Sequence, residues 1–227
     1  MDRDKLIDIK QTFAFWCAST AARSSPKCRF TNEQGIDIAR NSALLCYRTL
    51  DKLFEKITLQ ESGFSPSKYH PNKFDPNNFP LNGFDDLHAD IRKELIEVAK
   101  EKITNKKMKF THGVAAKFIN VYFKAMFLND VPPECIVQEM RINALHPPID
   151  SVLLQNLAEQ KVGDLEKFWK EKENKGWSNF SSDDYEDVIQ HIKYVTKGRL
   201  WEIEEFWPGF KKTKKVINNP TLPVYEP

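Results

Sequence analysis

Residues 86–104 read DLHADIRKELIEVAKEKIT, and this stretch decides the fold class. Apolar residues recur in it at every third or fourth position, as they do on one face of an α-helix, and charged residues fill most of the positions between them. The apolar stripe consists of Leu87, Ile91, Leu95, Val98 and Ile103. The pattern predicts an amphipathic helix that buries this stripe against the rest of the protein.

The same periodicity extends outward to both ends of the chain. Further helices are predicted over residues 4–22, from Thr31 or Asn32 to Phe54, over 111–128, from Asp150 onward, and over 163–173, 182–197 and 199–207. Only 8 of the 227 residues are glycine, which disfavours a turn-rich β fold. We therefore expect an all-α protein, with a single globular multi-helix domain over residues 1–210.

Two segments break the helical pattern. Residues 62–84 are punctuated by prolines and glycines, and they predict a long aromatic loop. The aromatic side chains of this loop need a surface to pack on; they are Phe64, Tyr69, Phe74, Phe79 and Phe84. Residues 211–227 carry four lysines and then three prolines, and they predict a loose basic and proline-rich tail.

The charge and the cysteines narrow the class of protein. The formal net charge is +2, so no global basic field indicates a nucleic-acid partner. No run approaches the ~18 apolar residues of a membrane span, and the N-terminus lacks the layout of a signal peptide. The four cysteines contain no Cys-x-x-Cys pair, and the histidines lack ligand spacing relative to them. We expect a cytoplasmic protein with reduced thiols, no metal and no membrane contact.

Lys117 is placed unusually for a charged residue. On the helix predicted over 111–128 its same-face neighbours are Gly113, Val114 and Val121, so the amine emerges from an apolar stripe. Burial disfavours the ammonium form and lowers the pKa of a lysine, which makes the amine a nucleophile nearer to neutral pH. The alternative interpretation is a lysine whose stem lies along the stripe while its charge reaches solvent.

Asp150 occupies a second special position. It follows His146-Pro-Pro-Ile149 and precedes an apolar helical run, so it falls where the N-cap of a helix belongs. As a cap alone it is worth ~1 kcal/mol. A carboxylate fixed at a helix start can also stabilise a developing cation. If Asp150 and Lys117 face each other across a cleft, they form a candidate catalytic pair.

The segment from about Thr111 to Leu154 resembles the core of the helix-hairpin-helix DNA glycosylases. In that superfamily a lysine on a helix precedes a Val/Ile-Pro-Val-Asp-like element whose aspartate begins the next helix. The sequence LHPPIDSVLL, which contains Asp150, is similar to the Pro-Ile-Pro-x-Asp-like element of the archaeal 8-oxoguanine DNA glycosylase branch. The long separation of Lys117 from Asp150 is also closer to that branch. The whole chain further resembles a bacterial family without an assigned function, through its Phe-Trp-x-Ala-Ser-x-Ala-Ala start and its Trp-x-Ile-Glu-x-Phe-Trp end.

The resemblance implies a DNA-glycosylase-like fold and an enzyme that acts on duplex DNA with a flipped base. Lys117 would attack the sugar, expel the base and form a Schiff base, while Asp150 would stabilise the positive charge on the sugar or activate the nucleophile. Such chemistry needs neither a metal nor an organic cofactor. The chain departs from the superfamily because the Gly-x-Gly hairpin is absent and only His112-Gly113 precedes the lysine helix. The DNA-backbone anchor that this hairpin normally forms therefore has no counterpart.

A flipped base is held by stacking, so aromatic residues are candidates for the pocket. The candidate substrate-binding residues are Trp16, His112, His146, Trp201 and Trp207, with Glu202 or Glu205 available to read a base edge. Core packing is the alternative role for each tryptophan, and we assign Trp169 and Trp177 to structure. The candidate phosphate-binding residues are Lys106, Lys107 and Lys109. Their alternative is a solvated loop, the usual place of a charge run.

Three other functions compete with DNA base excision. In a non-catalytic helical binding or regulatory protein, Lys117 and Asp150 would form a structural ion pair. A hydrolase could use His112 or His146, but neither has a serine or cysteine nucleophile beside it in the sequence. A purely DNA-binding module is disfavoured by the net charge of +2.

Overall fold

The computed structural model of the chain describes residues 3–24, 28–43, 45, 82–105, 108–127 and 142–208. Within these ranges every regular element is an α-helix or a 3₁₀ helix, which confirms the all-α prediction for this part of the chain. Residues 46–81 and 209–227 lie outside it, and so do most of the predicted aromatic loop and the whole predicted tail.

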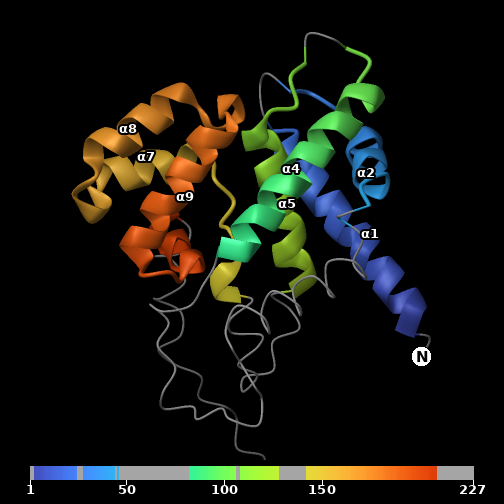
Figure 1. Cartoon of the computed structure of the whole chain (residues 1–227), viewed down its shortest axis with the longest axis horizontal. Coiled ribbons are helices and arrows are strands. Elements are labelled where there is room, and N and C mark those ends of the chain that lie inside the picture. The colour runs from blue at the N-terminus through green and yellow to red at the C-terminus, as the bar shows by residue number, and fades with distance from the viewer. Residues whose placement is uncertain are drawn as a thin grey trace, which may run out of the picture.

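Helix α5 (His112–Phe127) is the centre of the arrangement. Twelve of its 16 residues are buried. Helices α1 (Arg3–Ala22) and α4 (Asn82–Lys102) pack against it, and η6 (Trp177–Asn179) and α9 (Ser182–Thr196) contact it as well. In Figure 1, α5 passes behind α4, with α1 on one side and the group α7 to α9 on the other. A lysine on α5 is therefore surrounded by protein on most sides.

The C-terminal group of helices contributes to the same hydrophobic core as α1, α4 and α5. Helix α7 (Ser151–Glu159) lies against α8 (Glu166–Lys175), with η5 (Val162–Asp164) between them in sequence, and η7 (Leu200–Phe206) lies against α9. Trp169 is fully buried here, and its Nε1 donates a hydrogen bond to the carbonyl of Val162 at 2.9 Å. The structure thus places Trp169 in the core, as predicted.

The second helix begins as predicted but ends early. Helix α2 (Asn32–Arg40) starts with the expected capping box, in which Thr31 and Gln34 bond reciprocally. The prediction that this helix continues past residue 40 is wrong. Asn41 stops it, because its side-chain Nδ2 bonds back to the carbonyl of Asp37 at 2.8 Å. The chain after the stop is then held by Glu94 of α4, which accepts hydrogen bonds from Ser42 and from the amide of Ala43.

The end of the predicted loop over residues 62–84 is also corrected. Helix α4 already begins at Asn82, so residues 82–84 are helical. Phe84 is only 2% exposed and packs against the rings of Phe123 and His146. The remaining aromatic residues of the predicted loop lie outside the described residues.

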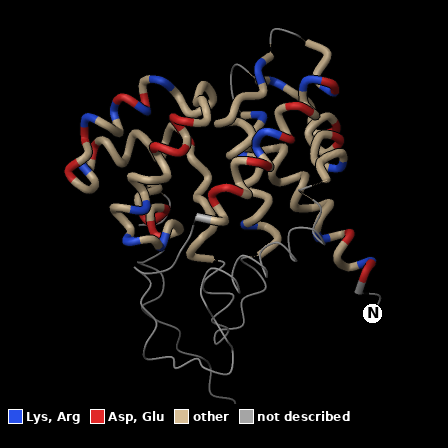
Figure 2. The backbone as a smooth tube through the Cα atoms, viewed as in Figure 1, with Lys and Arg blue, Asp and Glu red and all other residues tan. Residues whose placement is uncertain are grey.

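Charge is distributed unevenly over the helices. Figure 2 shows charged residues of both signs along α4 and α8, whereas α5 is almost free of them. Its charged residues are Lys117 and Lys124. Within the described ranges, no helix has the length and apolar character needed to cross a membrane.

Candidate active site

A glycine at the start of α5 lets η6 approach the lysine helix. A Cβ built on Gly113 would lie 1.8 Å from the carbonyl oxygen of Trp177, a distance no side chain tolerates. The amide of Gly113 also donates to the carbonyl of Phe180 at 3.3 Å. This close backbone contact places the ring of Trp177 beside Lys117, one turn further along α5.

Lys117 lies in a nearly closed environment. The residue is 8% exposed, and its Nζ lies 4.4 Å from the centre of the Trp177 ring. Nζ also lies 3.5 Å from Oδ2 of Asp150. Burial lowers the pKa of Lys117 below its ordinary value, although the charge of Asp150 and its hydrogen bond act in the opposite direction. The amine is thereby shifted toward its neutral, nucleophilic form.

Asp150 is the N-cap of α7, as predicted. Its backbone is extended, and its Oδ1 accepts a hydrogen bond from the amide of Leu153 at 2.9 Å. The cap fixes the carboxylate and leaves Oδ2 to face Lys117. The Asp150 side chain is 25% exposed against 10% for that of Lys117, so the pair is more open to solvent on the carboxylate side.

A second buried lysine, Lys172, provides a comparison for the ion pair of Lys117. Lys172 is 5% exposed, and its Nζ lies 3.3 Å from Asp184 and 2.9 Å from Asp187. Burial alone would lower the pKa of Lys172, but its two carboxylate partners outweigh burial and raise it. Lys117 has one carboxylate partner, so burial prevails. Of the two lysines, only Lys117 has a pKa below its ordinary value, which favours the neutral amine.

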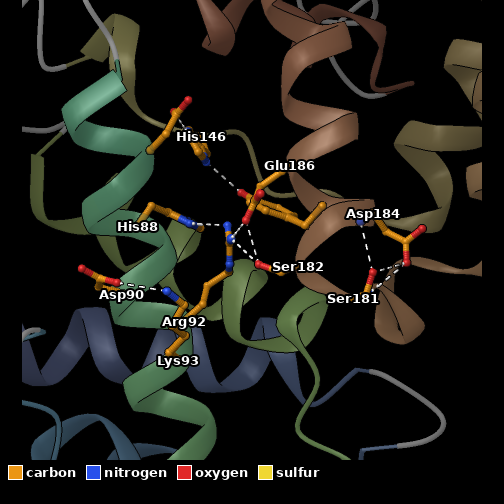
Figure 3. Close-up of polar contacts among 11 residues, drawn as sticks. His88, Asp90, Arg92, Lys93, His146, Ser181, Ser182, Asp184 and Glu186 are labelled. Atoms are coloured by element: carbon orange, nitrogen blue, oxygen red, sulfur yellow. Dashed lines mark hydrogen bonds and ion pairs between the residues drawn. The ribbon is translucent and has the colours of Figure 1, made fainter.

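The strap, residues 146–150, carries Asp150 into place and is anchored by His146. His146 is 3% exposed, its Nδ1 lies 3.0 Å from the hydroxyl of Tyr185, and its Nε2 lies 3.0 Å from Oδ1 of Asp85. Figure 3 shows this ring between α4 and α9. The expectation that His146 binds substrate is therefore corrected, because both ring nitrogens are occupied and the ring is in the core. The same burial removes His146 as the acid–base residue of a hydrolase.

The bonds of His146 belong to a larger buried polar network, formed by Asp85, His88, Asn120, His146 and Tyr185. Arg92 bonds to Nδ1 of His88 at 3.0 Å, as Figure 3 shows. A guanidinium can only donate, so His88 is neutral and carries its proton on Nε2, which donates to Oδ1 of Asn120 at 2.8 Å. Asn120 in turn donates to the hydroxyl of Tyr185 at 2.9 Å, which leaves that hydroxyl to donate to His146. His146 then donates to Asp85, so every hydrogen bond in this chain has one donor and one acceptor.

Trp16 lies apart from the pair. It is 49% exposed on α1 and stacks on Phe13, with 6.4 Å between the ring centres. Leu6 and Ile9 are also exposed on this helix. The described contacts of Trp16 thus place it in an apolar stripe on α1, and none of them connects it to Lys117.

Trp201 lies in η7 and Trp207 follows it, and of the two only Trp207 has a described contact with α5. Trp201 donates to Oδ1 of Asn143 at 2.9 Å. The centre of the Trp207 ring lies 5.6 Å from the Nζ of Lys124, and Lys124 also pairs with Glu204. Lys124 follows Lys117 by two turns, about 10 Å along the helix axis, on the same face.

Two polar atoms near Lys124 are buried without a hydrogen-bond partner in the described part of the chain. They are Oε1 of Glu204 and Nε1 of Trp207. The sequence predicts Glu202 or Glu205 as the residue that reads a base edge. Glu202 pairs with Arg199, and Glu205 is exposed. Of the three glutamates of η7, Glu204 is the one that pairs with a residue of α5, Lys124.

His112 and Lys109 line a hollow of about 620 Å³ at the start of α5. Its apolar walls come from α4 and from the segment before α5, and its described lining includes Lys100 and no acidic residue. Burial lowers the pKa of His112, and its Nδ1 is buried without a hydrogen-bond partner among the described residues. Lys106 and Lys107, the other candidate phosphate ligands, lie outside the described residues. The described residues contain no cluster of His, Cys, Asp and Glu that could hold a metal ion.

Sequence reasoning missed two residues of this site. Trp177 was assigned to structure, but its ring contacts the amine of Lys117. The available signal was Gly113, since a glycine within a helix indicates a close approach by another part of the chain. Asn120 was also missed, although it lies within the apolar run of α5, where a polar residue requires partners.

Comparison of the chain with protein-family models, with curated proteins and with solved structures finds no match. The functional argument therefore depends on the geometry of the Lys117–Asp150 pair and its surroundings.

Proposed function

We propose that this protein is a DNA glycosylase/lyase-like enzyme that excises a modified or damaged base through Lys117, assisted by Asp150. The observation that carries the proposal is a buried amine 3.5 Å from a carboxylate whose other oxygen is held by a helix cap. The contrast with Lys172 supports it, because burial is offset there by two carboxylates and is not offset at Lys117.

The chemistry begins with a nucleotide turned out of the duplex. The lone pair of the neutral Lys117 amine forms a bond to the sugar C1′ carbon, and the bond between C1′ and the base breaks. The electron pair of that bond leaves with the base, which takes up a proton. Asp150 stabilises the positive charge that builds on the sugar and accepts the proton that the attacking amine releases. Opening of the sugar ring, with a proton passing to the ring oxygen, then gives the Schiff base.

The surroundings of the pair suit a nucleic-acid substrate. The hollow at the start of α5 presents Lys100, Lys109 and His112, and it lies about one and a half turns from Lys117 along the helix. Positive side chains in such a place can hold phosphate groups. Trp177 and Trp207 offer aromatic faces along the side of α5 that carries both lysines. Stacking on such faces is the usual way to hold an extruded base.

The test is borohydride trapping, because a Schiff base at Lys117 is reducible to a stable bond between protein and DNA. Duplexes should carry oxidised guanine, uracil, alkylated purines or modified cytosines. Lys117→Gln should abolish trapping and leave folding intact. Asp150→Asn should slow base release by orders of magnitude while it keeps the cap, because asparagine caps about as well as aspartate. Lys172→Gln is the matched control, which should trap DNA as the wild type does.

The competing function is a non-catalytic helical binding or regulatory protein. That function becomes the better one if no duplex of the panel loses a base or is trapped. Trapping that persists in Lys117→Gln would reject Lys117 as the nucleophile.

A further inference from the structure

A single side chain links the helix of Lys117 to the strap that carries Asp150. Asn120 is 1% exposed and follows Lys117 by three residues on α5. Its Nδ2 donates to the carbonyl of Pro147 at 2.8 Å, and Pro147 precedes Asp150 by three residues. Among the described residues, this bond and the Lys117–Asp150 contact itself are the polar links between α5 and the strap.

The amide of Asn120 is held in one orientation by its neighbours. Arg92 makes Nδ1 of His88 an acceptor, so Nε2 of His88 must donate, and only the oxygen of the amide can receive that bond. The NH₂ group then faces Pro147 and Tyr185. Turning the amide over would set donor against donor at His88. The network therefore guarantees that a donor points at the carbonyl of Pro147.

The other polar anchors of the strap among the described residues are the two hydrogen bonds of His146. His146 ties the strap to Tyr185 of α9 and to Asp85 of α4. The bond to Asp85 fixes the strap to α4, and the bond to Tyr185 returns to α5 only through Asn120, which donates to the same hydroxyl. The distance between the strap and α5 decides whether Oδ2 of Asp150 reaches the amine of Lys117.

We propose that Asn120 is a positioning residue of the Lys117–Asp150 pair, because its amide clamps the carbonyl of Pro147 to α5 and so holds Asp150 at the amine. The consequence for catalysis rests on the proposed function. The geometric claim does not, and it can be tested without DNA.

The test is a double-mutant cycle on the pKa of Lys117, measured from the pH dependence of its acetylation by competitive labelling and mass spectrometry. In the wild type, Asp150→Asn should lower this pKa, because it removes the negative charge beside the amine. In the Asn120→Leu background the same substitution should lower it by less than about half as much, because the carboxylate is no longer held in place. An equal drop in both backgrounds overturns the proposal.

Ile119→Ala is the matched control for lost stability. Ile119 is the preceding residue of α5 and is fully buried, but it makes no polar link to the strap. This variant should keep the full drop in the pKa of Lys117. If Asn120→Leu does not fold, Asn120→Ser replaces it, since a serine hydroxyl is too short to reach both His88 and Pro147. A coupling lost equally in Ile119→Ala would also overturn the proposal, because general loosening of the core would then explain it.

The two proposals fail in different ways. If the wild type releases no base from DNA, the proposed function fails, while the labelling cycle still decides the role of Asn120. If the wild type is active, Asn120→Leu should slow base release in a single turnover and leave the Kd for DNA nearly unchanged. A change confined to DNA affinity would count against positioning.

Discussion

At the scale of the residue, the two buried lysines are expected to respond in opposite ways to loss of charge. Lys117→Met should leave the free energy of unfolding unchanged or raise it by about 1 kcal/mol, because it removes a desolvated ammonium. The Asp150 carboxylate left behind is partly exposed and keeps its cap bond. Lys172→Met should lower the free energy of unfolding by about 2 kcal/mol, because Asp184 and Asp187 both lose a partner. Urea denaturation of the two variants measures the difference, and an equal loss in both would contradict it.

The sequence predicts the positions of some site residues and not those of others. The positions of Lys117 and Asp150 follow from local patterns, an apolar stripe and a helix cap, and the structure brings the two groups together. The burial of His146 does not follow from such patterns, because its partners lie 39 and 61 residues away along the chain. Trp177 reaches Lys117 only through the packing of η6 on α5. Contacts that depend on tertiary packing leave no local periodicity in the sequence.

At the scale of the element, the packing of η6 on α5 gives a prediction with an unusual sign. Replacing a glycine within a helix by alanine ordinarily stabilises the helix by about 1 kcal/mol. Gly113→Ala should instead destabilise the protein by about 3 kcal/mol, because the new Cβ would lie 1.8 Å from the Trp177 carbonyl oxygen. Thermal unfolding measures the change, and a raised Tm would show that η6 does not pack closely on α5.

The ends of the elements were harder to predict than their existence. Helices α5 and α9 lie within a residue or two of the expected ranges, because a strong stripe and a side-chain cap define them. Helix α2 stops at Arg40 because Asn41 bonds back to Asp37, although the apolar pattern continues beyond it. Helix α4 begins at Asn82, inside a segment whose glycines and prolines predicted a loop. The end of α2 thus depends on a local side-chain bond, whereas the first turn of α4 packs through Phe84 on Phe123 and His146.

At the scale of the whole molecule, the buried polar network connects α4, α5, α9 and the strap. Its histidines are neutral because each has one nitrogen that accepts a hydrogen bond, from Arg92 at His88 and from Tyr185 at His146. Burial lowers the pKa of both histidines. The site of Lys117 and Asp150 therefore depends on a core that must stay uncharged at these two positions.

This dependence predicts that stability falls in mild acid. An unfolded histidine takes up a proton below a pKa of about 6.5, whereas His88 and His146 stay neutral in the folded protein until lower pH. The unfolded state then binds more protons, so the free energy of unfolding falls as the pH falls below about 6.5, by up to ~1.4 kcal/mol per pH unit for each histidine. His112, whose pKa burial also lowers, acts in the same direction more weakly because it is partly exposed. Urea denaturation between about pH 5 and pH 7 measures the slope.

The control for this slope is His88→Gln. Glutamine can accept from Arg92 through its oxygen and donate to Asn120 through its NH₂ group, so it keeps both bonds of His88 without a titrating group. If His88 is protonated only on unfolding, this substitution should reduce the slope of the free energy of unfolding against pH by up to ~1.4 kcal/mol per pH unit, which corresponds to one proton. An unchanged slope would mean that His88 takes up its proton over the same pH range in the folded and the unfolded protein. That result would contradict a neutral His88 whose Nδ1 accepts from Arg92, whereas the bond from Nε2 to Asn120, and with it the orientation of the amide that faces the strap, would remain the same in a protonated ring.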